Sequence, residues 1–494
     1  MLKRVRVILT VLLLLATVGV DAQVTTASMA GKVTDASNEP IIGATVQAVH
    51  QPSGSRYGTV TNVDGRYSIQ GMRTGGPYRV EISYIGYQTV IYKDITLQLG
   101  EVYNLNVEMS ESSELLNEVI VTAAKTKFTA EKTGATTNIS SAQITQLPTV
   151  NRSISDIARL SPYANGMSFA GGDGRSTNFT IDGANFNNNF GLSSNLPGGG
   201  NPISMDAIEE VQVVVAPFDV RQTNFIGGGI NAITKSGTNT FRGTAYTYYR
   251  NQDMRGNRIN GEDLGARSDE SKTTYGFTLG GPIIKNKLFF FVNYEKEKTP
   301  GEVIKYRARE DGEDAKGMVS RTLKSDMEKV YNHLKDKYGY DAGSYTNFPA
   351  DEENTKLLAR IDWNITDRHR LSLRYNNTKN TAWNAPNGNS SDTGYRLNNT
   401  YRVGTQSMAF ANSMYSMDNK VQSWAADLNS RFTDKISNQL LFTYTNIEDM
   451  RGTNSSPFPF IDIMAGKDEN GNQILEPYMS AGYELFTYNN GVKN

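Results

Sequence analysis

Side chains in residues 240–450 alternate between apolar and polar, and this period of two constrains the fold more than any other feature. In residues 357–365 an apolar face alternates with a mixed face: Leu357, Ala359, Ile361, Trp363 and Ile365 against Leu358, Arg360, Asp362 and Asn364. Residues 241–250, 371–375 and 424–432 repeat the pattern. Alternating segments of about ten residues are typical of transmembrane β-strands, which present one face to lipid and one to a wet lumen. The pattern therefore predicts barrel strands.

The connections between these strands alternate in length. Short turns are predicted at 285–287, 366–369 and 433–435, and long polar loops at about 251–271, 299–354 and 377–421. Outer-membrane barrels have short turns at the periplasmic end and long loops outside. A soluble β-sandwich also has alternating strands, but it does not explain the loop lengths. A helix is predicted in the second long loop, where apolar residues recur at helical spacing: Leu323, Met327, Val330 and Leu334.

Seven strands are predicted up to residue 450. A lipid-facing sheet cannot leave its edges open, because the unpaired backbone groups would have no water partner. We therefore expect further strands beyond this sequence, so that residues 236–494 supply only the N-terminal part of a large barrel.

The N-terminus has the features of an export signal. A basic start is followed by an apolar stretch at 7–20 and the small-residue site Val20-Asp21-Ala22, which predicts a signal peptide at 1–22. The apolar run is shorter than the ~20 residues that a spanning helix needs. The chain has no Cys, which excludes disulfides and thiolate metal sites, and its net charge of −1 excludes the basic footprint of a nucleic-acid-binding protein.

Residues 23–110 consist of short β-prone runs that are separated by turn residues such as Asp64-Gly65, which predicts a small β-sandwich. His50 is the only histidine in this segment, so no catalytic His/Glu pair is present. The stretches "GKVTDASNEPIIGATVQA", "TNVDGRYSIQGM" and "VEISYIGYQTV" resemble the carboxypeptidase regulatory-like domain, which has a carbohydrate-binding-like fold. Bacteroidetes outer-membrane receptors commonly carry this domain at the N-terminus.

Residues 111–124 form a polar linker that ends in a compact β-prone run. No phosphate-binding loop of the GxxxxGK[ST] type occurs, so work at an outer membrane without ATP must be delivered mechanically. An extended peptide suits this task because it can add as a strand to a partner's sheet. The sequence "EVIVTA" resembles the TonB box, which implies a coupling role for Glu118, Val119, Ile120, Val121, Thr122 and Ala123. The alternative is that this run is the first plug strand.

Residues 115–235 combine a short helix, glycine-rich turns and strands. The spacing of Ile154, Ile157 and Leu160 predicts a helix at 151–160 that ends before Ser161-Pro162. Strands are predicted before the turn Asp182-Gly183 and at 205–215. The Asn/Gly/Ser-rich loop at 185–200 has few side chains that can be buried.

The stretches "FTIDGANFNN" and "ISMDAIEEVQVVVAPFDVRQTNFIGGGINAITKSGTNTFRGTAYTYYR" are similar to plug domains of TonB-dependent receptors, particularly the Oar-like group. The resemblance covers about 115–250 and implies a 22-stranded plugged barrel. Gly171–Arg175 matches the family's Arg-Gly pattern loosely, because Ser176 and not Gly follows Arg175. Plug residues expected to face the substrate are Arg175, Asp182, Phe186, Asn188 and Asn189.

The expected fold class is therefore mainly β: a small β-sandwich, a mixed α/β plug, and the opening strands of a transmembrane barrel. The three histidines are scattered, so we expect no catalytic site, metal site or cofactor, and no enzyme. The resemblance implies a receptor that imports a glycan, a peptide or a metal chelate, with TonB, outer-membrane lipids and a surface lipoprotein as partners. The alternatives are an Oar-like adhesion protein that displays its loops and an enzyme component that acts on polysaccharide.

Overall fold

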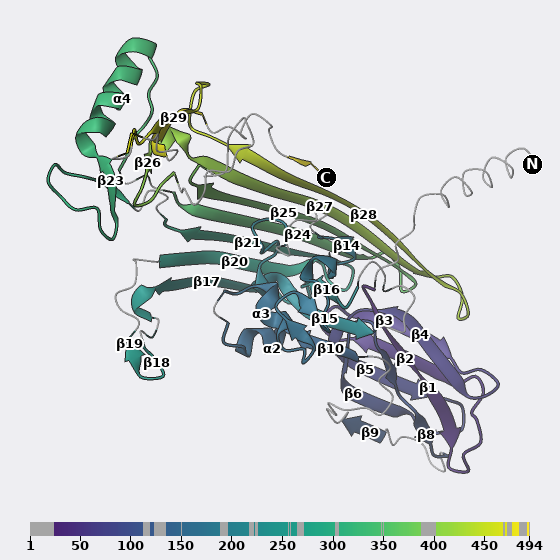
Figure 1. Cartoon of the computed structure of the whole chain (residues 1–494). Coiled ribbons are helices and arrows are strands. Elements are labelled where there is room, and N and C mark those ends of the chain that lie inside the picture. The colour runs from purple at the N-terminus through teal and green to yellow at the C-terminus, as the bar shows by residue number, and fades with distance from the viewer. Residues whose placement is uncertain are drawn as a thin grey trace, which may run out of the picture.

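The structure is a computed structural model, and it shows three parts in series (Figure 1). It describes residues 24–111, 119–122, 135–149, 151–187, 196–216, 222, 226–254, 256, 258–263, 271–301, 306–346, 348, 350–386, 402–467, 470–471, 477–483 and 492–493. The predicted signal peptide lies outside these residues. In Figure 1 the purple N-terminal domain lies at one end of a long curved sheet, and the blue plug elements lie beside that sheet.

The N-terminal domain is the predicted β-sandwich. Its strands are β1 (Ala27–Asp35), β2 (Thr45–His50), β3 (Ser55–Val60), β4 (Arg66–Met72), β5 (Gly75–Ser83), β6 (Val90–Leu97), β7 (Val102–Asn104), β8 (Val107–Met109) and β9 (Val119–Thr122). One sheet has the order β4-β1-β7, with β8 also paired to β1, and the other has the order β3-β2-β5-β6-β9. Met29, Val46 and Tyr78 are completely buried in the core. Gly65 has a φ of +73°, as the predicted turn at Asp64-Gly65 requires.

Strand β9 belongs to this N-terminal domain. It runs parallel to β6, with Val119 opposite Val90 and Thr122 opposite Lys93. The plug sheet has the order β10-β15-β16-β13-β14 and does not include β9. The alternative interpretation of this run as the first plug strand is therefore wrong. The reason is that β-prone sequence specifies an extended backbone but not the sheet that the strand joins.

The plug packs against the inner face of the curved sheet. Its elements are β10 (Ala135–Ser140), α2 (Ser141–Gln146), α3 (Ile154–Ala158), β11 (Ala164–Asn165), β12 (Ser168–Phe169), η1 (Gly174–Ser176), β13 (Asn178–Ile181), β14 (Ala184–Asn185), η2 (Met205–Ala207), β15 (Ile208–Ala216) and β16 (Gly229–Thr234). The predicted helix before Ser161 is confirmed as α3, with Ser153 at its N-cap. The plug core also takes in side chains of the curved sheet, namely Phe291, Leu358, Val421 and Ile447.

The curved sheet is antiparallel, with the order β17-β20-β21-β24-β25-β27-β28-β31. Its strands are β17 (Arg242–Asn251), β20 (Ser271–Ile284), β21 (Leu288–Thr299), β24 (Glu352–Asn364), β25 (His369–Asn384), β27 (Tyr415–Arg431), β28 (Ser437–Gly452) and β31 (Val492–Lys493). The seven strands predicted up to residue 450 are all present. The sheet is open among the described strands, since β17 and β31 stand at its two ends.

The strands are longer than the alternating pattern predicted. Strands β25, β27 and β28 have 16, 17 and 16 residues, so the loop predicted at 377–421 is confined to 385–414. Residues 376–384 are mostly polar, but they still pair with β27. The neighbouring antiparallel strand supplies hydrogen-bond partners for backbone N–H and C=O groups, whatever side chains the strand carries. The predicted short turns are confirmed, and they occupy residues 285–287, 365–368 and 432–436.

The two faces of the curved sheet differ as the sequence predicted. Ile361 and Trp363 are 42% and 40% exposed on the outer face, whereas Leu358 and Asp362 on the inner face are buried. Other exposed apolar side chains are Phe277, Leu279, Leu373, Trp424, Leu440 and Phe442. Inward-facing polar side chains are buried against the plug: Asn293, Glu295, Lys356, Arg374, Asn376 and Ser423. The sheet therefore has an apolar outer wall and a polar inner wall.

The long loops form a small structured cap at the other end of the sheet. Its elements are β22 (Arg307–Arg309), β23 (Val319–Leu323), α4 (Lys324–Tyr338), β26 (Met408–Ala409), η4 (Ala411–Ser413), β29 (Ile461–Met464) and β30 (Pro477–Ala481), with η3 (Gln252–Met254), β18 (Arg258–Ile259) and β19 (Glu262–Asp263) in the first long loop. Helix α4 confirms the helix predicted from apolar spacing, and Gly339 ends it with a φ of +65°. Met327 and Leu334 are buried in the core of the cap.

Candidate functional site

A network of charges joins the plug to the inner wall of the sheet. Asp182 lies in the turn after β13, where its carboxylate accepts hydrogen bonds from the backbone N–H of Thr234 (2.9 Å) and from the Thr234 hydroxyl (2.6 Å). Two wall guanidinium groups flank the same carboxylate, those of Arg360 at 3.5 Å and Arg374 at 3.7 Å. The single carboxylate therefore holds the plug turn both to strand β16 and to the barrel wall.

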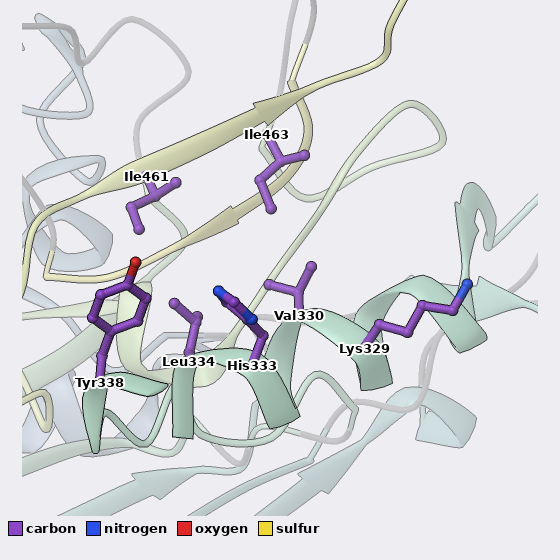
Figure 2. A pocket seen from close by; sticks show the side chains of 7 residues that line it. All are labelled: Lys329, Val330, His333, Leu334, Tyr338, Ile461 and Ile463. Atoms are coloured by element: carbon purple, nitrogen blue, oxygen red, sulfur yellow. The ribbon is translucent and has the colours of Figure 1, made fainter. Parts of the chain in front are cut away.

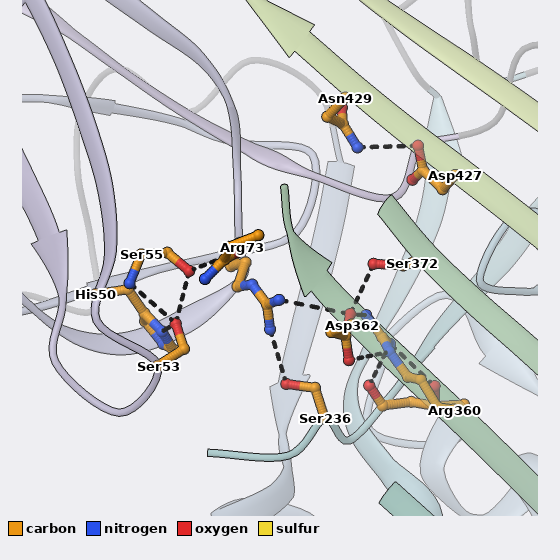
Figure 3. A network of polar contacts seen from close by, with 12 residues as sticks. His50, Ser53, Ser55, Arg73, Ser236, Arg360, Asp362, Ser372, Asp427 and Asn429 are labelled. Atoms are coloured by element: carbon orange, nitrogen blue, oxygen red, sulfur yellow. Dashed lines mark hydrogen bonds and ion pairs between the residues drawn. The ribbon is translucent and has the colours of Figure 1, made fainter. Parts of the chain in front are cut away.

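The N-terminal domain joins the same network (Figure 3). Asp362 on β24 is completely buried and accepts two hydrogen bonds of 3.0 Å from Arg360, while the Ser372 hydroxyl donates a third at 2.6 Å. Arg73, which follows β4, lies 3.6 Å from Asp362 and donates a hydrogen bond of 3.1 Å to Ser236. N-terminal domain, plug and wall thus meet at one set of ion pairs.

Further contacts fix the N-terminal domain to the short-turn end of the sheet. The Thr25 hydroxyl donates to Asp427 at 2.6 Å, and the Ser55 hydroxyl donates to Asn364 at 3.2 Å. The Arg370 guanidinium stacks on the Tyr57 ring, 3.8 Å from its centroid. Between the three parts lies a polar cavity of about 430 Å³, lined by side chains that include Arg73, Asp182, Glu209, Arg360, Arg374 and Asp427.

A carboxyl group at the boundary between plug and N-terminal domain has a strongly shifted pKa. Glu210 on β15 accepts hydrogen bonds of 3.0 Å from the backbone N–H of Leu99 and from the Asn138 side chain. Burial raises the pKa of Glu210 to about 7, although these hydrogen bonds oppose the shift. Gln212 donates to the Leu99 carbonyl at 2.6 Å. The contact between the two domains therefore includes a group that titrates near neutral pH.

A second buried ion pair lies within the wall, between strands β24 and β21, and contacts the plug through one hydrogen bond. Lys356 and Glu295 lie 2.8 Å apart, with side chains 1% and 4% exposed. Glu295 also accepts hydrogen bonds from the hydroxyls of plug residue Ser204 (2.8 Å) and wall residue Tyr246 (2.9 Å). These hydrogen bonds satisfy the carboxylate of a buried pair, which would otherwise be costly to desolvate. The Ser204 hydroxyl thus gives the plug a second contact with charged groups of the wall.

The predicted substrate-facing residues have different surroundings. Arg175 is exposed and is paired with Asp173 at 2.5 Å. Phe186 is completely buried, beside Phe179 and under the Arg374 guanidinium. Asn188 and Asn189 lie outside the described residues. The structure brings Asp182 and Phe186 together around Arg374, and Arg175 lies apart from them. The substrate-facing role of these residues stays a prediction.

The predicted coupling residues lie only partly within the described structure. Val119, Ile120, Val121 and Thr122 form β9, whereas Glu118 and Ala123 are outside it. The strand is the last in its sheet, and no further strand pairs with its outer edge in the described part of the chain. Its coupling role stays a prediction.

The cap contains a cavity of about 480 Å³ at the far end of the molecule (Figure 2). Val330, Leu334 and Tyr338 of α4 point towards Ile461 and Ile463 of β29, and Lys329 and His333 complete the lining. The cavity is therefore mainly apolar, with two groups able to carry positive charge.

Sequence reasoning missed Arg73, Arg360, Arg374 and Asp362. The sequence did contain a signal for Arg360, Arg374 and Asp362. Each is a charged residue at an inward position of an alternating strand, and a charge buried against a plug needs a partner of opposite charge. Within the described residues, no three His, Asp or Glu side chains are arranged to hold a metal ion. None of the helices in that part of the chain is long and apolar enough to cross a membrane.

Two family models match the chain. The carboxypeptidase regulatory-like domain matches residues 28–110, and the outer membrane beta barrel domain matches residues 233–303. The first range covers strands β1 to β8, and the second covers β17, β20 and β21. The first match confirms the resemblance of the N-terminal domain, and the second confirms the barrel strands predicted from alternation and locates the protein in the outer membrane.

The chain is also similar to a curated protein and to solved structures. The TonB-dependent transporter Oar of Myxococcus xanthus is 25% identical over 376 residues, which are 70% of this chain and 33% of that protein. The outer membrane transporter YddB of Escherichia coli is 14% identical with a TM-score of 0.46, covering 70% of this chain and 43% of that one. The siderophore receptor PirA of Pseudomonas aeruginosa is 15% identical with a TM-score of 0.40, covering 65% and 42%. This chain thus spans about a third of Oar. It carries a carboxypeptidase regulatory-like domain and an outer-membrane β-barrel domain, and it is homologous to the TonB-dependent transporter Oar.

Proposed function

We propose that the protein is a TonB-dependent outer-membrane receptor that imports a nutrient into the periplasm. The observation that carries the proposal is a plug with its own sheet, whose turn residue Asp182 is ion-paired to Arg360 and Arg374 of the wall. We infer that this contact holds the plug in place and that it can open while the barrel strands stay paired, because it is not part of their backbone pairing. Homology to a protein named as a TonB-dependent transporter supports the same function.

The proposed energy input is a pull by the periplasmic domain of TonB on residues 118–123. β9 supports this role because it is a short extended strand, the form in which peptides add to a partner's sheet. The substrate is proposed to be a glycan, a peptide or a metal chelate that enters from the cap side, with a surface lipoprotein as a further proposed partner. The apolar outer face would contact outer-membrane lipids.

The test is capture of the full-length receptor by a purified periplasmic domain of TonB. A variant with residues 118–123 replaced by Gly and Ser is compared with one in which only linker residues 111–114 are replaced. We expect binding to be lost in the first variant and kept in the second. Equal binding of both would show that the coupling segment lies elsewhere. If the unmodified receptor did not bind, an adhesion protein that displays its loops would become the better explanation.

A further inference from the structure

Strand β9 occupies the otherwise unpaired edge of β6. Strand β6 pairs with β5 on one side, and four successive residue pairs, from Val90 with Val119 to Lys93 with Thr122, complete its other side. The run that resembles a coupling segment is therefore bound to the N-terminal domain of the same chain.

That domain is itself fixed to the rest of the receptor. Arg73 reaches Asp362 of the wall and Ser236, and Thr25 reaches Asp427 of β27. Leu99 is bonded through its backbone to Glu210 and Gln212 of the plug. A pull on β9 in this state is therefore borne by the N-terminal domain and its contacts with the wall, in addition to the chain that leads to the plug.

We propose that the β6 edge is a strand-accepting surface that holds β9 in competition with the partner that pulls it. The inference rests on the proposed function, because it takes residues 118–123 as the coupling segment and the periplasmic domain of TonB as that partner. In strand addition, main-chain hydrogen bonds supply affinity and pockets for alternate side chains supply specificity. One edge of β9 is taken up by β6 while this pairing lasts, and the strand stays attached to the N-terminal domain, so we expect the partner to engage and pull β9 only after it has left β6.

The length of the pairing makes such an exchange possible. Only four residues of β9 are paired, compared with the 16 residue pairs between β25 and β27 in the barrel. The short pairing can open while the domain stays folded, since the core residues that the structure describes in this domain, from Ala27 to Met109, all precede β9. The N-terminal domain would then control how often the coupling segment is available.

The absence of Cys from the chain permits a direct test with an engineered disulfide. Lys93 is exposed and lies opposite Thr122, so the double variant Lys93→Cys with Thr122→Cys can lock β9 to β6 without disturbing the core. The matched control is Lys93→Cys with Val121→Cys, in which the second thiol points to the opposite face of the sheet. Disulfide formation is followed by thiol titration and mass spectrometry. Binding of the full-length receptor to the periplasmic domain of TonB is measured before and after reduction.

We expect oxidation to lower binding by the 93/122 variant at least tenfold, and reduction to restore the unmodified level, which also shows that the variant folds. The 93/121 control should bind equally in both states. Equal binding by the locked and reduced 93/122 protein would overturn the inference while leaving the proposed function in place. Failure of the 93/122 thiols to join, in a receptor that binds TonB, would also overturn it. Absence of binding by the unmodified receptor would instead remove the proposed function, and the competition with it.

Discussion

Arg73 of the N-terminal domain lies 3.6 Å from Asp362 of barrel strand β24, and this pair connects two parts of the chain that are far apart in sequence. Asp362 is completely buried and also receives two hydrogen bonds from Arg360, so it stays compensated if Arg73 is removed. The pair therefore positions the N-terminal domain and is not needed for the stability of the barrel.

We expect Arg73→Ala to loosen the N-terminal domain from the wall at a cost of about 1–2 kcal/mol while leaving the barrel folded. Hydrogen exchange should become faster in residues 364–370 and 233–236. Arg79→Ala is the matched control, because Arg79 pairs with Glu81 on the same domain at 3.0 Å with both side chains more than 30% exposed. If both variants gave the same exchange, the Arg73 contact would not position the domain.

We expect the negative charge of Asp182 to hold the plug in its position against the barrel wall. We expect Asp182→Asn to weaken the contact between plug and wall by about 3–5 kcal/mol, because it leaves the buried guanidinium of Arg374 without its carboxylate partner, while Arg360 keeps Asp362. Asparagine tolerates the φ of +45° at this turn, so the variant isolates the charge from the backbone. Protease sensitivity of the plug in the detergent-purified receptor measures the effect. Asp173→Asn, which removes an exposed pair with Arg175, should have almost no effect.

Glu210 should make the contact between plug and N-terminal domain depend on pH. Burial raises the pKa of its carboxyl from 4.5 to about 7, so the folded protein binds more protons than the unfolded chain between these values. Stability therefore falls as pH rises from about 4.5 to 7, by up to about 3 kcal/mol. Thermal unfolding of the purified receptor from pH 5 to 8 measures this change. Glu210→Gln should flatten the profile in that window, and an unchanged profile would contradict the assignment.

We expect His50 to make the stability of the N-terminal domain depend on pH in the opposite sense to Glu210, and at lower pH. Burial, with a smaller contribution from Arg73, lowers the pKa of its imidazole from 6.5 to about 3, so the ring is neutral in the fold. The unfolded chain then binds more protons between pH 3 and 6.5, and stability falls as pH decreases through this range. His50→Gln should reduce the loss of N-terminal domain structure at pH 4, followed by hydrogen exchange in residues 45–60. His333→Gln, which changes an exposed side chain of the distant cap, should leave it unchanged.

The barrel wall could be predicted because its signal is local. Each strand alternates with a period of two, so Ile361 and Trp363 share one face and Arg360 and Asp362 the other, whatever lies beyond the strand. The spacing of Met327, Val330 and Leu334 predicted α4 for the same reason. The strand ends were less predictable, since polar residues at 376–384 pair as well as apolar ones.

The sequence by itself determined the order of the parts: a β-sandwich, a plug, and alternating strands with an apolar outer face. Only the tertiary structure decided that β9 pairs with β6, that Asp182 meets Arg360 and Arg374, and that Arg73 reaches Asp362. The physical reason is that periodicity records the environment of a side chain, buried or exposed, and this is fixed by its own element. The partner of a buried charge or of a free strand edge depends on how separate sheets pack together, and no local pattern contains that information.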